Sequence, residues 1–448
     1  MVETLSLKRL SSDGAAVGQL ADGRTAFIAS GCPGDVVEAM IDSEKPRFVR
    51  GHVARVIEPG PQRVDPRCSY FGWGKCGSCQ WQHIGEDAAR EAKRGVIVDA
   101  LVRIGKLADV DALTRPVLAS PQSWGYRNKI ELEARLVRGR LELGFHRAGS
   151  SELVCPDACP LFAAPFADLL KSLQGALRYS LGSVDYRLSR VALRYSDRSS
   201  AFEIACVTEP GPFPRARVAS TLKTACPSLT SIVRVLQKTP PAGSGRRRPT
   251  PQLKGVEVLA GAGCWEERLA GFSYKVSAPS FFQVNTAAAE LLVGLAREAL
   301  AADGSDHVAD LYCGVGTFSL PLAADGGTLS AVESCGPALR DLRRNLDGAG
   351  LSAEVIGGEV GRDTSALGSV DGIVVDPPRA GLSHGARAEI LRLAPARLAY
   401  VSCDPATLAR DLAALVAAGY SLRWLQPVDL FPHTPHVECV ASLSKEPV

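Results

Sequence analysis

HVADLYCGVGTFSL, residues 307–320, runs from an apolar segment through a glycine-containing turn into a second apolar segment. The first segment ends at Asp310, and Gly314 and Gly316 follow in the turn, where residues without Cβ atoms let the backbone approach a ligand closely. Glu333 closes the next apolar segment, 23 residues after Asp310, and its carboxylate can accept hydrogen bonds from both hydroxyls of a ribose. Because the third glycine of a GxGxxG motif is missing, the pattern favours a nucleoside cofactor without a pyrophosphate over a dinucleotide.

The sequence around this turn alternates between helical and strand-like segments. A helix is predicted over residues 286–301, and the apolar segments TLSAVES, AEVIGG, GIVVDPP and RLAYVSC follow the glycine turn in that order. Such alternation is typical of a doubly wound parallel sheet. The segment SLRWLQPVDLFPHTPHVECVASL, residues 421–443, predicts a hairpin that completes the sheet. The strand, turn, helix and acidic residue together resemble the class I methyltransferases, which bind S-adenosylmethionine. An ordinary strand-to-helix turn is the alternative.

The fourth and fifth predicted strands of this sheet end in distinctive residues. The fourth ends in DPPR, residues 376–379, the fifth in SCDP, residues 402–405, and both ends point to the cofactor crevice. Methyltransferases that act on exocyclic amines carry an aromatic residue after the paired prolines, where this chain has Arg379. RNA cytosine-5 methyltransferases place a cysteine near the fourth-strand motif, where this chain has none. The available thiol is therefore that of Cys403.

Four segments together, DLYCGVGTFSL, VVDPPRAGL, YVSCDPATLARDL and FPHTPHVECVASL, resemble the RNA uridine-5 methyltransferase family. The resemblance extends over essentially the whole chain, and the N-terminal region resembles the TRAM domain of many members. The resemblance implies that the cofactor or the base is contacted by Gln283, Tyr312, Thr317, Glu333 and Asp376 beside the turn at Gly314 and Gly316. Thr317 stands where some relatives have asparagine, and Asp404 replaces the usual asparagine after the cysteine. We expect Asp404 to preserve the geometry of that turn.

Methylation of carbon 5 of uracil requires a nucleophile and a base. Carbon 5 is a poor nucleophile, so a thiolate must first add at carbon 6 and turn the ring into an enolate that attacks the methyl sulfonium. Cys403 is the predicted nucleophile. A base must then remove the proton on carbon 5 so that the thiolate can leave, and Glu438 is the predicted base. We interpret the neighbouring His433 and His436 as turn-forming residues and not as metal ligands.

Three cysteines lie close together in the segment CSYFGWGKCGSCQWQH. The thiolates of Cys68, Cys76 and Cys79 can bind one metal centre, and both a zinc ion and a [4Fe–4S] cluster need a fourth ligand. Cys155 and Cys159 in ELVCPDACPLF are the candidates. Family members with a [4Fe–4S] cluster have a similar CGGCxxQH segment and a later Cys-Pro. The resemblance therefore implies a cluster with Cys159 as the fourth ligand, and zinc or unligated core cysteines are the alternatives.

The rest of the chain suggests two further domains. Short apolar runs separated by turn signals in residues 1–58 predict a small antiparallel β-barrel. A helix is predicted at 88–105, and alternating segments between about 125 and 275, such as KIELEARL and AFEIACV, predict an antiparallel sheet with helices. We therefore expect a TRAM-like, OB-like barrel at 1–58, a central α+β domain with the metal site at 59–278, and a Rossmann-like α/β methyltransferase domain at 279–448.

The predicted RNA contacts lie in a basic segment of the central domain. Residues 234–254 hold six basic side chains and no acidic ones: Arg234, Lys238, Arg246, Arg247, Arg248 and Lys254. A loop of this charge is a candidate site for phosphate contacts, and a solvated surface loop is the alternative.

Composition limits the class of protein. The 448 residues are 46% hydrophobic and 22% charged, as in ordinary globular proteins, and no apolar run is long enough to cross a membrane. Because the N-terminal segment also lacks the apolar region of a signal peptide, we expect a cytoplasmic protein without membrane contact. We also expect a monomer. The net charge is only +3, so RNA binding must come from local patches.

The sequence thus predicts an S-adenosylmethionine-dependent enzyme that methylates carbon 5 of a uridine in structured RNA. Ribosomal RNA is favoured over transfer RNA. One alternative is a noncatalytic RNA-binding or chaperone protein with a methyltransferase fold. The other is a methyltransferase that acts on an exocyclic amine.

Overall fold

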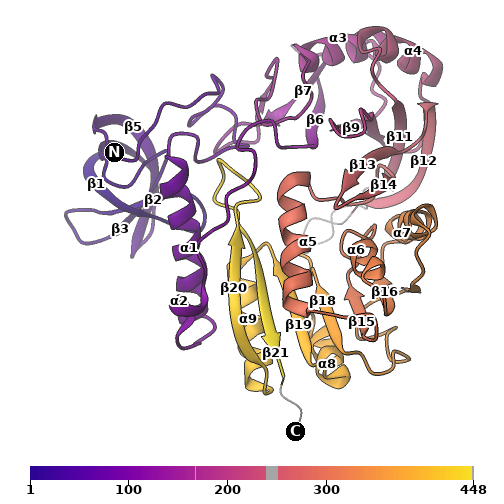
Figure 1. Cartoon of the computed structure of the whole chain (residues 1–448). Coiled ribbons are helices and arrows are strands. Elements are labelled where there is room, and N and C mark those ends of the chain that lie inside the picture. The colour runs from indigo at the N-terminus through magenta and orange to yellow at the C-terminus, as the bar shows by residue number, and fades with distance from the viewer. Residues whose placement is uncertain (167, 239–250, 446–448) are drawn as a thin grey trace.

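Three groups of strands follow one another along the chain (Figure 1). The computed structural model describes residues 1–166, 168–238 and 251–445. A closed barrel comes first, a seven-stranded sheet with two helices comes second, and another seven-stranded sheet with helices comes last. None of the helices in these residues is long and apolar enough to cross a membrane.

The N-terminal barrel has five strands in the order β1-β2-β3-β5-β4. Their bounds are β1 Val2–Leu10, β2 Ala16–Gln19, β3 Thr25–Ala29, β4 Val36–Glu44 and β5 Phe48–Glu58. The predicted barrel is confirmed, but the prediction that all its pairs are antiparallel is wrong, because β3 and β5 pair in parallel. In a closed ring with an odd number of strands, directions cannot alternate all the way round, so one parallel pair is required.

Helix α1 (Glu86–Arg103), from the N-terminal half of the chain, packs against the C-terminal region. The short helix α2 (Val110–Leu113) follows it, and its packing partner α9 (Pro405–Ala417) comes much later in the chain. Ile97 and Leu101 of α1 share one apolar cluster with Leu408 and Leu412 of α9. In Figure 1, α1 accordingly stands beside the C-terminal strands and not beside the central sheet.

The central sheet has the order β12-β11-β10-β9-β6-β7-β8. Its strands are β6 Lys129–Val137, β7 Arg140–His146, β8 Leu153–Val154, β9 Leu188–Tyr195, β10 Phe202–Thr208, β11 Ser231–Lys238 and β12 Gln252–Gly261, and its helices are α3 Leu169–Leu181 and α4 Arg215–Ala225. The prediction of an antiparallel sheet is wrong at one pair, because β10 and β11 run in parallel. Helix α4 connects these two strands, and a helical crossover of this kind returns the chain in the same direction.

The C-terminal sheet has the order β17-β16-β15-β18-β19-β21-β20. A hairpin of β13 (Trp265–Leu269) and β14 (Phe272–Val276) precedes it. The strands are β15 His307–Leu311, β16 Thr328–Glu333, β17 Glu354–Gly357, β18 Gly372–Val375, β19 Arg397–Ser402, β20 Ser421–Val428 and β21 Glu438–Ser444, and the further helices are α5 Thr286–Leu300, α6 Ser319–Ala324, α7 Gly336–Ala349 and α8 His384–Leu393. Strands β15 to β19 are parallel, and β20 and β21 form the predicted antiparallel hairpin. The doubly wound sheet is thereby confirmed.

Both faces of this sheet are covered by apolar side chains. Along β19, Ala399 and Val401 lie in a cluster with residues of α5, while Leu398 and Tyr400 lie in the cluster that α1 and α9 share. Since successive side chains of a strand point to opposite faces, the two clusters occupy the two faces of the sheet. The order of connection reverses at β15, which lies between β16 and β18, and ligands bind at the carboxyl ends of strands at such a point.

Candidate active site

The glycine turn after β15 needs its glycines for two different reasons. Gly314 has a φ of 57° and Gly316 a φ of 98°, both in the left-handed region that favours glycine. A Cβ atom on Gly316 would lie 2.6 Å from Leu320 Cδ1 and 2.7 Å from Leu342 Cδ1, whereas one on Gly314 would meet nothing within 4 Å. Close packing against the two leucines therefore requires glycine at position 316, whereas the space beside the Cα atom of Gly314 is open.

A cleft of about 620 Å³ opens at the ends of the parallel strands. The side chains and backbone that line it come from Tyr312, Val332, Glu333, Ser334, Gly358, Glu359, Val360, Pro378, Ala380, Gly381, Leu382, Ser383, His384, Arg387 and Arg410. Of the predicted cofactor residues, Tyr312 and Glu333 are in this lining. Gly314, Gly316 and Thr317 belong to the adjoining turn, and Thr317 is almost fully buried.

Glu333 is already oriented by the backbone around it. Its Oε2 accepts a hydrogen bond from the Gly314 amide at 2.9 Å, and its Oε1 accepts one from the Cys335 amide at 2.6 Å. The carboxylate at the end of β16 is thus fixed across the glycine turn. This position agrees with the predicted contact to a ribose, because carboxylate oxygens can accept more than one hydrogen bond.

Asp310, at the end of β15, is a buried acid that the sequence marked only as a strand end. Ser319 Oγ donates to its Oδ2 at 2.5 Å, and its Oδ1 has no hydrogen-bond partner. Burial, together with the carboxylates of Asp376 and Glu333, raises the pKa of Asp310 to about 7, and the hydrogen bond from Ser319 acts in the opposite direction. The acid is therefore partly protonated near neutral pH.

Cys403 and Glu438 lie at neighbouring strand ends. Ser402, the last residue of β19, pairs with Cys439 of β21, so the next residue along each strand toward this end is Cys403 and Glu438 respectively. Cys403 is half-buried and Glu438 is 4% exposed. The antiparallel register thus brings the predicted nucleophile and the predicted base together.

The charges at this site oppose ionisation. Burial, followed by the carboxylates of Glu438 and Asp376, raises the pKa of the Cys403 thiol to about 12, while the guanidinium of Arg379 acts in the opposite direction. Burial and the neighbouring Asp376 raise the pKa of Glu438 well above its ordinary value, and Arg379 again lowers it. In the protein alone, the Cys403 thiol is therefore held in its neutral form at pH 7, and ionisation of Glu438 is disfavoured.

Gln283 connects the segment before α5 to the same site. Its Nε2 donates to Asp376 Oδ2 at 3.2 Å, and its backbone carbonyl accepts a hydrogen bond from Asn128 Nδ2 at 2.8 Å. Burial raises the pKa of Asp376 to about 7, and the hydrogen bond from Gln283 lowers it. Gln283 and Asp376 are therefore together, as their predicted shared role requires, although neither is in the cleft lining.

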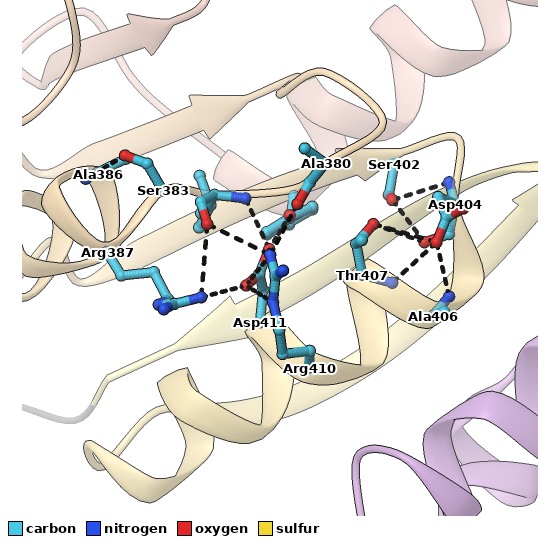
Figure 2. A network of polar contacts seen from close by, with 12 residues as sticks. Ala380, Ser383, Ala386, Arg387, Ser402, Asp404, Ala406, Thr407, Arg410 and Asp411 are labelled. Atoms are coloured by element: carbon cyan, nitrogen blue, oxygen red, sulfur yellow. Dashed lines mark hydrogen bonds and ion pairs between the residues drawn. The ribbon is translucent and has the colours of Figure 1, made fainter. Parts of the chain in front are cut away.

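Asp404, the residue after Cys403, has the turn geometry that was expected. Its Oδ1 accepts hydrogen bonds from the amides of Ala406 at 3.0 Å and Thr407 at 2.9 Å, which caps the N-terminus of α9 (Figure 2). An asparagine has the same acceptor oxygen, so the substitution leaves this cap intact.

Sequence reasoning missed a buried carboxylate about two turns further along α9, that of Asp411. Asp411 accepts hydrogen bonds from the Leu382 amide, the Tyr400 hydroxyl and the guanidinium groups of Arg387 and Arg410 (Figure 2). These contacts join β19, α8, α9 and the loop after DPPR. The two arginines also line the cleft, so Asp411 helps to shape its wall. The sequence gives no signal for this, because the partners are distant along the chain.

The four cysteines predicted as metal ligands line one cavity. Its walls are formed by Cys68, Tyr70, Phe71, Cys76, Ser78, Cys79, Gln82, Phe145, Pro156, Ala158, Cys159, Pro160 and Leu161. All four predicted ligands are present there and Cys155 is not. Within the described ranges, however, no group of three or more His, Cys, Asp or Glu side chains is arranged to hold a metal ion.

The basic segment is only partly as predicted. The prediction that Arg234 contacts phosphate is wrong, because this residue lies within β11 and is only 1% exposed. Its guanidinium group donates to Thr208 Oγ1 at 2.8 Å and to the Glu209 carbonyl at 3.0 Å. Lys238 and Lys254 are exposed on β11 and β12. Arg246, Arg247 and Arg248 lie outside the described residues.

Three comparisons relate the chain to known proteins. The family model described as tRNA (Uracil-5-)-methyltransferase matches residues 267–350 and 367–446. The chain is 34% identical to an uncharacterized RNA methyltransferase of Thermosynechococcus vestitus, with 98% of this chain and 97% of that protein covered. It is also 34% identical to an uncharacterized RNA methyltransferase of Gloeobacter violaceus, with 99% and 96% covered. The crystal structure of the Pyrococcus abyssi tRNA (uracil-54, C5)-methyltransferase in complex with S-adenosyl-L-homocysteine is similar with a TM-score of 0.72 and 26% identity, and the match covers 98% of this chain and 99% of that one.

Proposed function

Because this chain belongs to the RNA uracil-5 methyltransferase family, we propose that it methylates carbon 5 of a uridine by covalent catalysis through Cys403. The observation that supports the proposal is the register of β19 and β21, in which Cys403 and Glu438 are neighbours at the ends of adjacent strands. A thiol is of no use to methyl transfer onto an exocyclic amine, and a noncatalytic RNA-binding protein needs neither group.

The donor groups around the cleft suit S-adenosylmethionine. Glu333 offers carboxylate oxygens to a ribose, and Tyr312 lines the same wall. The glycine turn leaves room at Gly314 for the backbone to approach a ligand. Bound here, S-adenosylmethionine supplies the electrophilic methyl group and a positive charge.

The proposed roles of the two catalytic residues follow the order of the steps. The Cys403 thiol loses its proton to solvent, and Sγ adds to carbon 6 of the uracil so that carbon 5 becomes nucleophilic. Carbon 5 then takes the methyl group from the sulfonium, which leaves as the neutral thioether S-adenosylhomocysteine. The carboxylate form of Glu438 then accepts the proton from carbon 5. The electron pair of that C–H bond re-forms the carbon 5–carbon 6 double bond, and the thiolate leaves. Arg379 favours both ionised forms, because its charge lowers the pKa of both groups.

We propose that Cys68, Cys76, Cys79 and Cys159 hold a [4Fe–4S] cluster. The support is that all four line one cavity whose other walls are largely apolar, while Cys155 is elsewhere and is influenced by Glu142 and Arg178. A zinc ion would use the same thiolates, and the metal content of the purified protein distinguishes the two. Burial raises the pKa of the Cys79 and Cys159 thiols, and the charge of Arg127 acts in the opposite direction, toward the thiolate forms that a metal binds.

Ribosomal RNA is the proposed substrate, and transfer RNA is the second candidate because the similar Pyrococcus abyssi enzyme acts on tRNA. The barrel of β1 to β5 is proposed to act as a TRAM-like RNA-binding module, and Arg246, Arg247 and Arg248 are proposed to contact phosphates. Replacing these three arginines together with alanine should weaken RNA binding and flatten its salt dependence, while the exposed Arg103→Ala on α1 should change neither. If the salt dependence of RNA binding stays unchanged, these arginines do not contact RNA phosphates.

The direct test supplies the purified protein with methyl-labelled S-adenosylmethionine and total RNA, then identifies the labelled nucleoside and its position. We expect label in 5-methyluridine at a defined site of ribosomal RNA. Label in tRNA alone would select the second substrate. Label in a methylated adenosine or guanosine, or RNA binding without any label, would overturn the proposed reaction.

A further inference from the structure

The loop that leads to Glu438 is held by an unusual series of backbone contacts. Residues 429–437 connect β20 to β21 and contain neither helix nor strand. Four successive carbonyl oxygens of this loop accept hydrogen bonds from separate parts of the chain: Leu430 from Asn285 Nδ2 at 2.9 Å, Phe431 from Lys93 Nζ at 3.1 Å, Pro432 from the Tyr126 hydroxyl at 3.1 Å, and His433 from the amides of Gln80 at 3.1 Å and Trp81 at 3.0 Å. An irregular segment is thus fixed almost as firmly as a strand.

Lys93 is the charged donor among these contacts. It lies on α1, is 1% exposed, and its Nζ contacts Asp429 Oδ1 at 2.5 Å as well as the Phe431 carbonyl. A buried ammonium group is costly unless it is paired and hydrogen-bonded, and here the loop supplies both partners. The proposed chemistry does not use this charge directly.

Two further contacts fix the same loop from the N-terminal side. The ring of Trp124 lies against that of His433 with 3.9 Å between centroids. A Cβ atom on Gly14, in the barrel turn between β1 and β2, would lie 3.1 Å from Pro435 Cγ. Gln80 and Trp81, which hold His433, directly follow Cys79 in the chain. The loop is therefore the place where the barrel, the cysteine segment and α1 meet the catalytic sheet.

We propose that Lys93 is a positioning residue for Glu438. By holding Asp429 and Phe431, it fixes the loop that precedes Glu438, while Glu438 itself pairs with Val428 at the start of the β20–β21 ladder. The carboxylate is then held opposite Cys403 from both sides. This inference rests on the proposed function, since it assigns to Lys93 an effect on the proton-removal step. A loss of this anchor displaces the base by a small distance, and displacements of about 1 Å can cost a step about a hundredfold.

The test uses the full-length protein with Lys93→Met and Asp429→Asn combined, so that no lone charge is left in the interior. The matched control is Lys129→Met with Glu131→Gln, which removes an ion pair of 2.7 Å in the central sheet, away from the loop. Each protein is mixed with RNA and S-adenosylmethionine, and the denaturant-resistant protein–RNA band, kcat and KM are measured. Circular dichroism and the melting temperature report folding.

For the Lys93 variant we expect kcat to fall by about ten- to a hundredfold, KM for S-adenosylmethionine to stay within about twofold, and the covalent band to accumulate. A merely structural role would lower the melting temperature without trapping that band. Tyr126→Phe removes one donor to the Pro432 carbonyl with little change in volume, so it tests the same loop if the double variant does not fold, and it should trap a weaker band. The inference is overturned if Glu438→Gln traps the band and neither loop variant does. If Glu438→Gln also fails to trap it, the proposed mechanism is what fails.

Discussion

Cys403 and Glu438 face each other one position beyond the last pair of the β19–β21 ladder, because Ser402 pairs with Cys439. The two groups required at successive steps thus come from neighbouring antiparallel strands. The carboxylate of Glu438 raises the pKa of the Cys403 thiol. Asp376 raises the pKa of both groups, and Arg379 lowers it for both.

Replacing Cys403 with alanine should lower methylation by about 10⁴-fold or more, since no thiolate can add to carbon 6. Affinity for S-adenosylmethionine, measured by calorimetry, should stay within about twofold because the cleft lining does not include this side chain. Cys335→Ala is the matched control, because that cysteine is exposed near Glu333. Methylation that survives in Cys403→Ala would show that the nucleophile has been assigned wrongly.

Glu438→Gln should trap a covalent protein–RNA species. The thiolate and the methyl donor are retained, but no base accepts the carbon-5 proton, so elimination stalls after methyl transfer. The measurement is a band that resists denaturant, requires S-adenosylmethionine and maps by mass spectrometry to Cys403. Normal turnover in this variant, or an adduct on another cysteine, would contradict the assignment.

Alkylation of Cys403 in the protein alone should increase about tenfold for each pH unit between pH 7 and 9.5. Because its pKa is raised to about 12, the thiolate fraction keeps rising with pH over this whole range. The thiol of a cysteine in an unstructured peptide should instead level off as the pH passes its pKa of about 8.5. Glu438→Gln removes a charge that raises this pKa, so alkylation at a fixed pH should become faster. A plateau near pH 8.5 in the unaltered protein would show that burial does not suppress the thiolate.

Protein purified without oxygen should be brown and contain about four irons per chain. Cys159→Ser should lose iron and colour, whereas Cys155→Ser should keep both, because only Cys159 of the two lines the cavity with Cys68, Cys76 and Cys79. Iron content and the visible absorption spectrum provide the measurement. Stoichiometric zinc without colour would exclude the cluster, and the reverse pattern between the two variants would exchange the fourth ligand.

Gly316→Ala should destabilise the protein more than Gly314→Ala. Both positions have positive φ, which costs a non-glycine residue about 1–2 kcal/mol. At Gly316 the new methyl group also overlaps Leu320 and Leu342, which adds about 1–3 kcal/mol. Denaturant unfolding measures the difference. Equal losses in the two variants would mean that the leucines move aside without cost.

Much of the fold could be predicted because its signals are local. The alternation of apolar segments, the glycines and the spacing to Glu333 depend on neighbours in sequence, and they predicted the C-terminal sheet and its final hairpin. Strand direction in the first two sheets was harder, since the parallel pairs β3–β5 and β10–β11 follow from ring closure and from the α4 crossover. Neither of these is written into the strands themselves.

The errors at the site concern side chains whose partners are far away in the sequence. Arg234 was predicted to face phosphates because its neighbours are basic, but its partners on β10, the loop after it and β12 bury it. Lys93 had a usable signal: it falls between Ala89 and Ile97 on the buried stripe of α1, where a lysine requires a buried acceptor. Asp429, 336 residues away, could not be identified as that acceptor from sequence.

β21 follows β20 in the chain but lies between β19 and β20 in the sheet. The predicted nucleophile and base are therefore neighbours in space, although Cys403 is synthesised 35 residues before Glu438. Every residue of the cleft lining also precedes Glu438 in the chain. A chain that ended within 429–437 would keep the attacking sulfur and lack the group whose action releases it. By the chemistry proposed for this pair, release of the methylated RNA depends on β21, the strand that is synthesised after the rest of the site.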